Sequence, residues 1–191
     1  MSETQTKMQH KTDLSLYNNS WFKPGAGKLK QVMWYFTNVL FFINPLNPSS
    51  GIKVFLLRLF SAQIGKGVVI KPSVNIKYPW KLKVGDHSWI GEKVWIDNLA
   101  EVEIASNCCI SQGAMLLTGN HNFRKTTFDL ITKGIILEEG AWIGAFAIVC
   151  PGVTVMSHAV LAVNSVATET LQPYSVYKGN PALLIRERII D

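Results

Sequence analysis

Aliphatic residues or alanine recur at every sixth position along most of the chain, and a small or β-branched residue stands four places after most of them. Beyond residue 136 the series is Leu137, Ile143, Val149, Val155, Leu161 and Ala167, and its fourth followers are Ala141, Ala147, Val153, Ala159 and Ser165. This period fits neither the repeat of an α-helix, about 3.6 residues, nor the alternation of an isolated strand. The pattern therefore indicates a repeat architecture.

The same hexads occur earlier, in three phased blocks that begin at Ile64, Val84 and Ile104. The phase slips by two residues near 77–83 and again near 102–104, which we interpret as small bulges between regular turns. Such hexads are typical of a triangular parallel β-helix, in which each hexad supplies one short strand and one corner. The aliphatic residues then point inward, and the small residues share a narrow core.

Glycine and tryptophan also keep the hexad phase. Glycine directly follows the aliphatic residue at Gly65, Gly85, Gly91 and Gly144. We expect corners with unusual backbone angles there. Tryptophan occupies the outward-facing sixth place at Trp89, Trp95 and Trp142. Outward tryptophans indicate a covered face, which is a subunit interface, a ligand groove, or a surface under the N-terminal segment.

The first sixty residues lack hexads. They start with a polar stretch, which lacks the apolar core that a secretory signal needs. Two apolar runs follow, at Val32–Ile43 and Ile52–Phe60. Neither run is long enough to span a bilayer as a helix. We expect residues 1–60 to form a polar tail and a helical cap, and residues 61–191 to form the β-helix.

A second interpretation of the N-terminal helices stays open. The segment is both basic and apolar, with Lys23, Lys28 and Lys30 close to the first apolar run. Such an element can rest on an anionic membrane instead of only capping the solenoid.

The hexads stop between Leu116 and Leu137, a gap of 21 residues where a whole coil needs 18. We expect a loop at about 118–136 to protrude there, with His121 near its root. Loops on a rigid scaffold are frequent sites of function, so His121 is the first candidate for chemistry. The other histidines fall at corners or, in the case of His10, in the polar tail.

The net charge of +6 and a pI near 9.3 favour an acidic partner, which can be a phosphorylated cofactor, an anionic membrane or nucleic acid. Nucleic acid is disfavoured because the sequence has no arginine-rich run, zinc-finger spacing or RNP-like motif. Cys108, Cys109 and Cys150 have no CxxC spacing, which is typical of a reduced cytoplasmic protein. Cys108 occupies an inner small slot, so we interpret it as a packed core residue.

The hexads, together with TGNHN, GAWIGAFAIVCPGVTV and YKGNPALLIR, resemble the hexapeptide-repeat acyltransferases of the maltose, galactoside and nodulation acetyltransferase group. From about residue 16 to the end, the chain also resembles, more specifically, acetyltransferases assigned to colanic acid biosynthesis. The fold class that follows is mainly β: a left-handed parallel β-helix with an N-terminal helical extension and a short C-terminal helix. The resemblance also implies a homotrimer that binds acetyl-coenzyme A between subunits, without a metal.

The resemblance gives His121 the role of general base. An imidazole can take the proton of a sugar hydroxyl as the oxygen attacks the thioester, typically worth ~10²–10⁴-fold in rate. On the acceptor side the resemblance places Asp97, Asn98 and Asn120. On the coenzyme side it places Trp142, Ala145, Val163, Thr168, Lys178 and Arg186.

Three residues depart from the family pattern. Leu183 stands where relatives can carry an arginine, and Glu169 stands where a lysine is common, which leaves Arg186 and Lys178 for the phosphates. Asn122 follows the histidine where aspartate is frequent. Without that carboxylate, Asp97 is the candidate to orient the site.

The sequence thus predicts an O-acetyltransferase for a sugar or lipid-linked saccharide of a surface or exopolysaccharide intermediate, cytoplasmic or peripheral at the inner face of the membrane. One alternative is another small hydroxyl acceptor, and another is a non-catalytic structural β-helix with a degenerate site. A zinc carbonic-anhydrase site on the same scaffold would need three converging histidines, whereas this loop has only His121.

Overall fold

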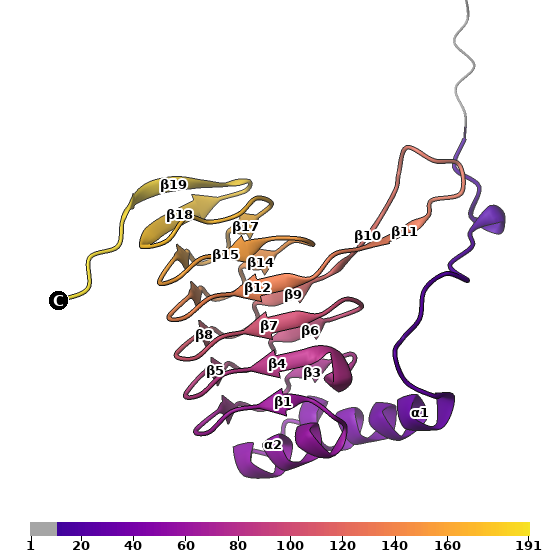
Figure 1. Cartoon of the computed structure of the whole chain (residues 1–191), viewed down its shortest axis with the longest axis horizontal. Helices are drawn as coiled ribbons and strands as arrows, with labels where there is room; N and C mark the ends of the chain where they lie inside the picture. Colours follow the sequence, from indigo (N-terminus) through magenta and orange to yellow (C-terminus); the bar gives the residue numbers. More distant parts are fainter. Residues whose placement is uncertain (1–10) are drawn as a thin grey trace, which may run out of the picture.

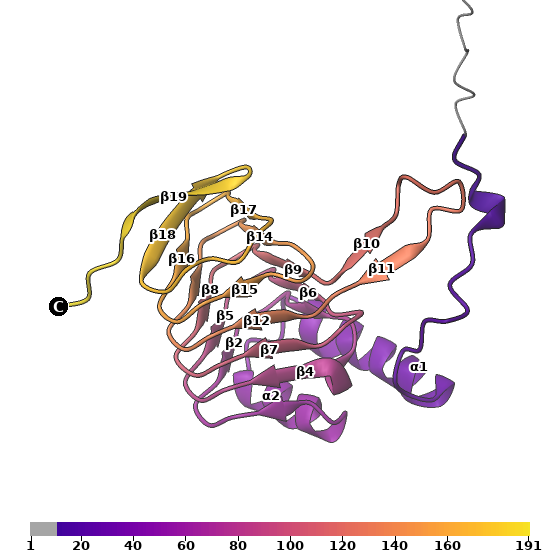
Figure 2. The same cartoon turned by 45° about the horizontal axis from the view of Figure 1, so that its top comes forward.

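The structure, a computed structural model, describes residues 11–191, so His10 lies outside the described part. Short strands wind into a three-sided parallel β-helix, and each side is one sheet (Figures 1 and 2). The first sheet stacks β1 (Gln63–Ile64), β4 (Leu82–Val84), β7 (Val102–Ile104), β12 (Ile135–Leu137) and β15 (Thr154–Val155). The second stacks β2 (Val69–Ile70), β5 (Trp89–Ile90), β8 (Cys109–Ile110), β13 (Trp142–Ile143), β16 (Val160–Leu161) and β18 (Ser175–Gly179). The third stacks β3 (Asn75–Ile76), β6 (Trp95–Asp97), β9 (Met115–Leu117), β14 (Ile148–Val149) and β17 (Val166–Ala167).

The predicted β-helix with N-terminal helices is confirmed, and the hexad residues occupy the predicted places. The aliphatic positions fill the core, so that Ile70, Ile90 and Ile143 are fully buried. The small positions are buried beside them, including Cys108 and Ala141. The outward tryptophans are 40–56% exposed.

The corners correct the expectation about glycine. Left-handed backbone lies three places after the aliphatic residue, for example at His87 (φ 58°) and Phe146 (φ 56°), and not at the glycine directly after it. The position directly after the aliphatic residue needs glycine for another reason, which is that the main chain of the next coil passes close to it. A Cβ atom on Gly144 would lie 2.6 Å from the main-chain nitrogen of Val163, and one on Gly85 would lie 2.5 Å from that of Ser106.

Coil length varies at one corner, between the third and first sheets, which we call the third-to-first corner. In the upper coils Trp142 pairs with Val160, 18 residues on, whereas in the lower coils Gln63 pairs with Lys83, 20 residues on. In the lowest coil the additional residues form the turn η3 (Pro79–Lys81). Two coils higher, the same corner opens into the antiparallel hairpin of β10 (Gly119–His121) and β11 (Leu130–Thr132), which projects from the prism (Figure 1).

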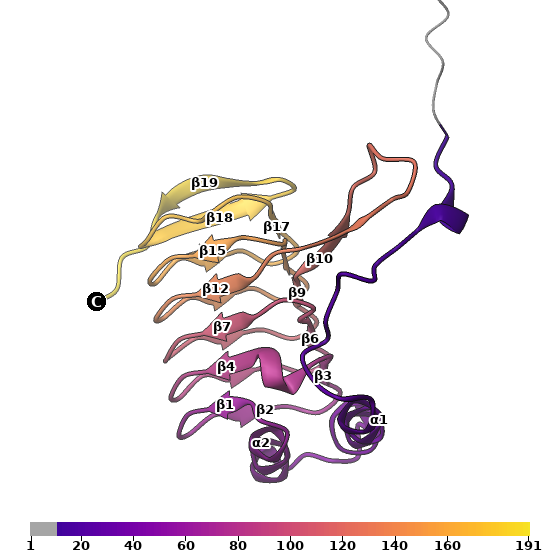
Figure 3. The ribbon, with the colours of Figure 1, turned by 45° about the vertical axis from the view of Figure 1, so that its right-hand side comes forward.

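The N-terminal segment contains η1 (Leu14–Leu16), α1 (Lys28–Thr37), a π-helical continuation η2 (Asn38–Ile43) and α2 (Ser50–Leu59). The helices lie across the N-terminal end of the solenoid (Figure 3). Trp34 and Phe42 are buried there, and the indole Nε1 of Trp34 donates to the Ile76 carbonyl at 2.8 Å. Within residues 11–191, no helix has both the length and the apolar character needed to cross a bilayer.

The C-terminal tail is a hairpin, so the expected short C-terminal helix is wrong. Strand β18 pairs in parallel with β16, and β19 (Ala182–Glu187) returns antiparallel to it. The open edge of β16 satisfies the main-chain groups of the tail, which a helix would otherwise have to satisfy locally. Asn180 and Pro181 form the tight turn between the two strands.

Candidate active site

His121 is the last residue of β10 and pairs with Leu130, at the far end of the short ladder that leaves the third-to-first corner. Its Nδ1 atom is 2.9 Å from the main-chain oxygen of Phe128. Because a carbonyl oxygen only accepts, Nδ1 must carry the hydrogen, and the neutral ring then has its lone pair on Nε2. The hairpin therefore holds His121 in the tautomer that a general base requires.

Aromatic rings fix the plane of the imidazole. The ring of Phe128 stacks on it with centroids 4.5 Å apart and an interplanar angle of 6°. The ring centroid of Tyr17 lies 5.8 Å from that of His121, because the N-terminal segment runs beside the hairpin (Figure 3). The main-chain nitrogen of Asp13 donates to the carbonyl of Thr126 at 2.9 Å and ties the two segments together.

Asn122 shapes the hairpin instead of orienting the histidine. Its side-chain oxygen accepts from the main-chain nitrogen of Arg124, and its own main-chain nitrogen donates to the carbonyl of Asp129. Phe128 has left-handed backbone (φ 50°), which is part of the turn that presents its carbonyl to His121. The absence of an aspartate at residue 122 therefore leaves the imidazole oriented all the same.

Asp97 was the expected orienting group, but the main chain of Phe128 takes that place. The Asp97 carboxylate lies 2.9 Å from the ammonium of Lys77 and is mostly buried. Its main-chain oxygen accepts from both the hydroxyl and the main-chain nitrogen of Thr118. Asp97 thus supports the hairpin root from the coil below.

The structure separates the other two acceptor-side candidates. Asn98 is fully buried, and its amide bonds both main-chain groups of Tyr78, at 2.6 and 2.9 Å. With no exposed surface and both ends of its amide bonded to Tyr78, Asn98 joins neighbouring coils at this corner, and its predicted contact with an acceptor finds no support. Asn120 is exposed next to His121, and its side-chain oxygen accepts from the His121 main-chain nitrogen at 2.8 Å.

A groove of about 660 Å³ lies along the second sheet and its corner with the third. It collects four of the predicted coenzyme residues, Trp142, Ala145, Val163 and Arg186. The indole of Trp142 donates to the Ser111 hydroxyl at 3.0 Å and forms part of the wall. The remaining two predicted residues lie outside this groove of the same chain: Thr168 follows β17 at the third-to-first corner, and Lys178 is exposed on β18.

Arginine from β19 gives the groove its positive end. Arg186, on β19, and Arg188, directly after the end of that strand, both line it. Arg188 donates from Nη1 to the carbonyls of Gly140 and His158, each at 3.0 Å, which fixes the C-terminal strand over the solenoid. A guanidinium at this position suits a phosphate.

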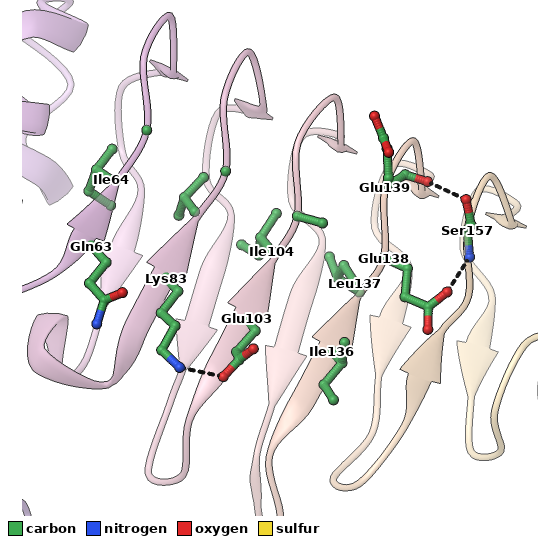
Figure 4. A pocket seen from close by; sticks show the side chains of 14 residues that line it. Gln63, Ile64, Lys83, Glu103, Ile104, Ile136, Leu137, Glu138, Glu139 and Ser157 are labelled. Atoms are coloured by element: carbon green, nitrogen blue, oxygen red, sulfur yellow. Dashed lines mark hydrogen bonds and ion pairs between the residues drawn. The ribbon is translucent and has the colours of Figure 1, made fainter.

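A second hollow, about 820 Å³ in volume, lies on the first sheet and its corner with the second (Figure 4). It is larger than the groove, but most of its charged groups are already paired. Lys83 lies 2.6 Å from the carboxylate of Glu103, and Glu138 accepts from the main-chain nitrogen of Ser157. The carboxylates of Glu103, Glu138 and Glu139 disfavour a phosphorylated ligand, so we assign the chemistry to the groove and the hairpin.

His121 and the groove are at different corners of one chain. His121 projects from the corner between the third and first sheets, whereas the groove lies at the corner between the second and third. Figure 2 shows the hairpin and the β18–β19 hairpin on opposite sides of the prism. Within one chain, His121 therefore lies outside the groove.

Sequence reasoning missed Phe128, Tyr17 and Arg188. Phe128 acts through a carbonyl, which has no residue-type signature. Tyr17 reaches the site only through the path of the N-terminal segment. Arg188 had a signal, because residues two apart in an extended chain share a face, but the tail was interpreted as a helix.

No protein-family model matches the sequence. The chain is 38% identical over 165 residues to a protein of Escherichia coli strain K12 named "Putative colanic acid biosynthesis acetyltransferase WcaF", which covers 86% of this chain and 91% of that protein. It is 26% identical over 136 residues to the galactoside O-acetyltransferase of the same strain, covering 69% of this chain and 66% of that one.

Among solved structures, a hexapeptide-repeat acetyltransferase from Vibrio cholerae in complex with acetyl-coenzyme A has a TM-score of 0.78 to this chain. The two are 21% identical, and the match covers 88% of this chain and 93% of the other. At that identity the likeness shows the fold. The similarity to the Escherichia coli protein extends over most of both sequences, and the chain belongs to the hexapeptide-repeat acetyltransferase family.

Proposed function

We propose that the protein transfers an acetyl group from acetyl-coenzyme A to a sugar hydroxyl, in a free or lipid-linked saccharide of a surface or exopolysaccharide intermediate. The observation that carries this proposal is the bond from His121 Nδ1 to the Phe128 carbonyl, which leaves Nε2 open to accept a proton. The coenzyme is a cytoplasmic metabolite, so the reaction belongs on the cytoplasmic side of the membrane.

His121 takes the hydroxyl proton on Nε2 while the sugar oxygen attacks the thioester carbonyl. The tetrahedral intermediate collapses, the carbon–sulfur bond breaks, and the imidazolium returns its proton to the departing thiolate. Products are the acetyl ester and free coenzyme A, with no covalent enzyme intermediate. General base catalysis of this kind contributes ~10²–10⁴-fold, and fixed positions for both substrates supply most of the rest.

The groove is the coenzyme half-site in this proposal. Trp142, Ala145 and Val163 flank the pantetheine arm along the second sheet, and Arg186 meets the phosphates. Lys178 adds positive charge on the neighbouring strand. Thr168 lies at the same corner as the hairpin, so it reaches the coenzyme from the chain that supplies His121. Asn120 and Asp97 lie on the acceptor side.

A homotrimer completes the site, since the two half-sites of one chain face different directions. A closed ring of copies places the hairpin of each chain against the groove of its neighbour. This arrangement predicts that two inactive variants complement each other. His121→Ala removes the general base, and Val163→Trp fills the groove from an exposed position.

Mixed trimers of these two variants, formed at equal amounts by reversible dissociation, test the shared site. Chance assembly leaves about a quarter of the sites with both His121 and an intact groove. We expect about that fraction of wild-type thiol release from acetyl-coenzyme A. A site within one chain would give none, because every chain then lacks one half.

The acceptor is identified by thiol release with sugars, nucleotide sugars and lipid-linked sugars. We expect turnover with at least one saccharide, and a fall of ~10²-fold or more in His121→Ala. Turnover that survives this substitution would remove the general-base role. Coenzyme binding, measured by calorimetry, serves as the control and is expected to persist in His121→Ala.

A further inference from the structure

Charge is strongly segregated along the chain. Residues 14–85 contain ten lysines or arginines and no aspartate or glutamate, whereas residues 86–191 contain seven basic and eleven acidic residues. The basic part forms α1, η2, α2 and the lowest coil, which together make up one end of the prism (Figure 1). The exposed side chains of Lys23, Lys28, Lys66 and Lys71 belong to this end.

The same end exposes a large apolar surface. In α1 and η2 the buried stripe is Trp34, Asn38 and Phe42, so that the opposite stripe faces away from the solenoid. That outward stripe includes Leu29, Met33, Phe36 and Leu40, each more than half exposed. A helix with apolar residues on both faces is typical of a segment that has a second apolar environment.

Helix α2 repeats this arrangement. It buries Lys53 and Leu57 against the lowest coil, where the Lys53 ammonium donates to the carbonyls of Asn47, Ile70 and Lys71. Ile52, Phe55 and Leu59 form the outward stripe, and Phe55 and Leu59 are each 65% exposed. Leu46, in the loop before the helix, is 86% exposed. We call the outward stripes of α1, η2 and α2 the base.

We propose that the base is a docking surface for an anionic lipid membrane. Apolar side chains that enter the headgroup boundary, together with lysines and no acidic residue within the segment, are the combination that binds such a surface. Two copies meeting base to base would bring like charges together, including the exposed lysines Lys23, Lys28, Lys66 and Lys71 of each copy, which opposes association. The charge therefore favours anionic lipid as the occupant over a second copy of the chain.

The inference does not depend on the acetyl transfer proposed above. If the chains do form a ring side by side through their prism faces, all bases point to the same side. Several bases on one rigid body then dock together, which raises the apparent affinity for a planar surface.

Flotation of the full chain with vesicles tests the proposal. Vesicles of phosphatidylglycerol and phosphatidylcholine are compared with vesicles of phosphatidylcholine alone. We expect binding to the anionic vesicles that weakens as salt is added, and weak binding to the neutral ones. The double variant Phe36→Gln/Phe55→Gln and the double variant Lys23→Gln/Lys28→Gln should each reduce binding by about tenfold or more.

Phe123→Gln is the matched control, because Phe123 is 73% exposed at the hairpin tip, away from the base. It should bind as the wild type does. Absence of anionic-vesicle binding, or binding that the Phe36/Phe55 variant leaves unchanged, would overturn the proposal. If the wild type does not bind vesicles and the Phe36/Phe55 variant has a lower mass in solution than the wild type, the base is a contact between copies of the chain. Acetyl transfer to a soluble acceptor, measured alongside, reports separately on the chemistry and should be equal in all these variants.

Discussion

The imidazole of His121 and the ring of Phe128 stack at 4.5 Å, while the carbonyl of the same phenylalanine holds His121 Nδ1 at 2.9 Å. One residue thus fixes both the plane and the tautomer of the histidine. The ring contact can be removed by substitution, whereas the carbonyl stays with the main chain.

Phe128→Ala should lower kcat about threefold to tenfold, because a stacked aromatic pair is worth about 0.5–1.5 kcal/mol. The KM for acetyl-coenzyme A should not change, because Phe128 contacts His121 and is not among the residues that line the groove. Steady-state kinetics measure both quantities. Phe123→Ala, on the same hairpin but without the stacking contact, is the control. An equal loss in both variants would indicate a general effect on the hairpin.

Arg186→Ala should raise the KM for acetyl-coenzyme A by about tenfold, the cost of about 1.4 kcal/mol for one charge-assisted contact. The KM for acetyl-pantetheine, which has no phosphate, should stay the same. Lys66→Ala removes a charge at the opposite end of the prism and should change neither value. An equal rise in KM for both donors would mean that Arg186 supports the shape of the groove and not the phosphate contact.

Cys108 should make the protein less stable at alkaline pH. Burial raises the pKa of its thiol to about 11. The folded state therefore prefers the neutral thiol, and the stability that this preference contributes is present below the ordinary pKa and lost as pH rises toward 11. The loss is on the order of 2 kcal/mol across that window. Denaturant unfolding at several pH values measures it.

Cys108→Ala is the matched variant, because alanine already fills the equivalent inner slots at Ala114 and Ala141. It should keep the fold and show a flatter decline of the unfolding free energy above pH 9 than the wild type. A decline of the same steepness in both proteins would exclude Cys108 as its source.

Gly144→Ala should destabilise the solenoid, because its Cβ atom would lie 2.6 Å from the Val163 main-chain nitrogen. Overpacking of this kind costs about 1–3 kcal/mol. Gly51→Ala in α2 provides the contrast, since the nearest atom to its Cβ would be 3.9 Å away. Its effect should be neutral or stabilising by up to about 1 kcal/mol. Thermal unfolding of both variants measures the difference, and similar melting temperatures would refute the close-approach explanation.

Much of the scaffold was predictable from sequence because the hexad pattern is a direct consequence of packing. A residue such as Ile143 must point inward, and a neighbour such as Ala141 must be small, whatever the function. The tail was mispredicted because its hairpin depends on the open edge of β16, a partner that no local pattern shows.

The site was predictable only in part, for a related reason. His121, Trp142 and Arg186 have side chains that signal chemistry, and the structure places them on the hairpin and in the groove. The group that orients His121 is a main-chain carbonyl. The side chain of Asn98 bonds the main chain of Tyr78 on the neighbouring coil. Such roles depend on which atoms the fold brings together, which a residue type does not indicate.

The variation in coil length at a single corner bears on how such enzymes change their acceptors. Insertions at the third-to-first corner leave the parallel ladders in register, since Ile135 still pairs with Val102 across the hairpin. Lengthening a loop of this kind costs little, about 0.6 kcal/mol for each doubling. That edge can therefore diversify while the groove that we propose for the acyl donor, built on a different edge, keeps its shape. If the proposed division of the site holds, selection can change which alcohol is acetylated without rebuilding the part that holds the acyl donor.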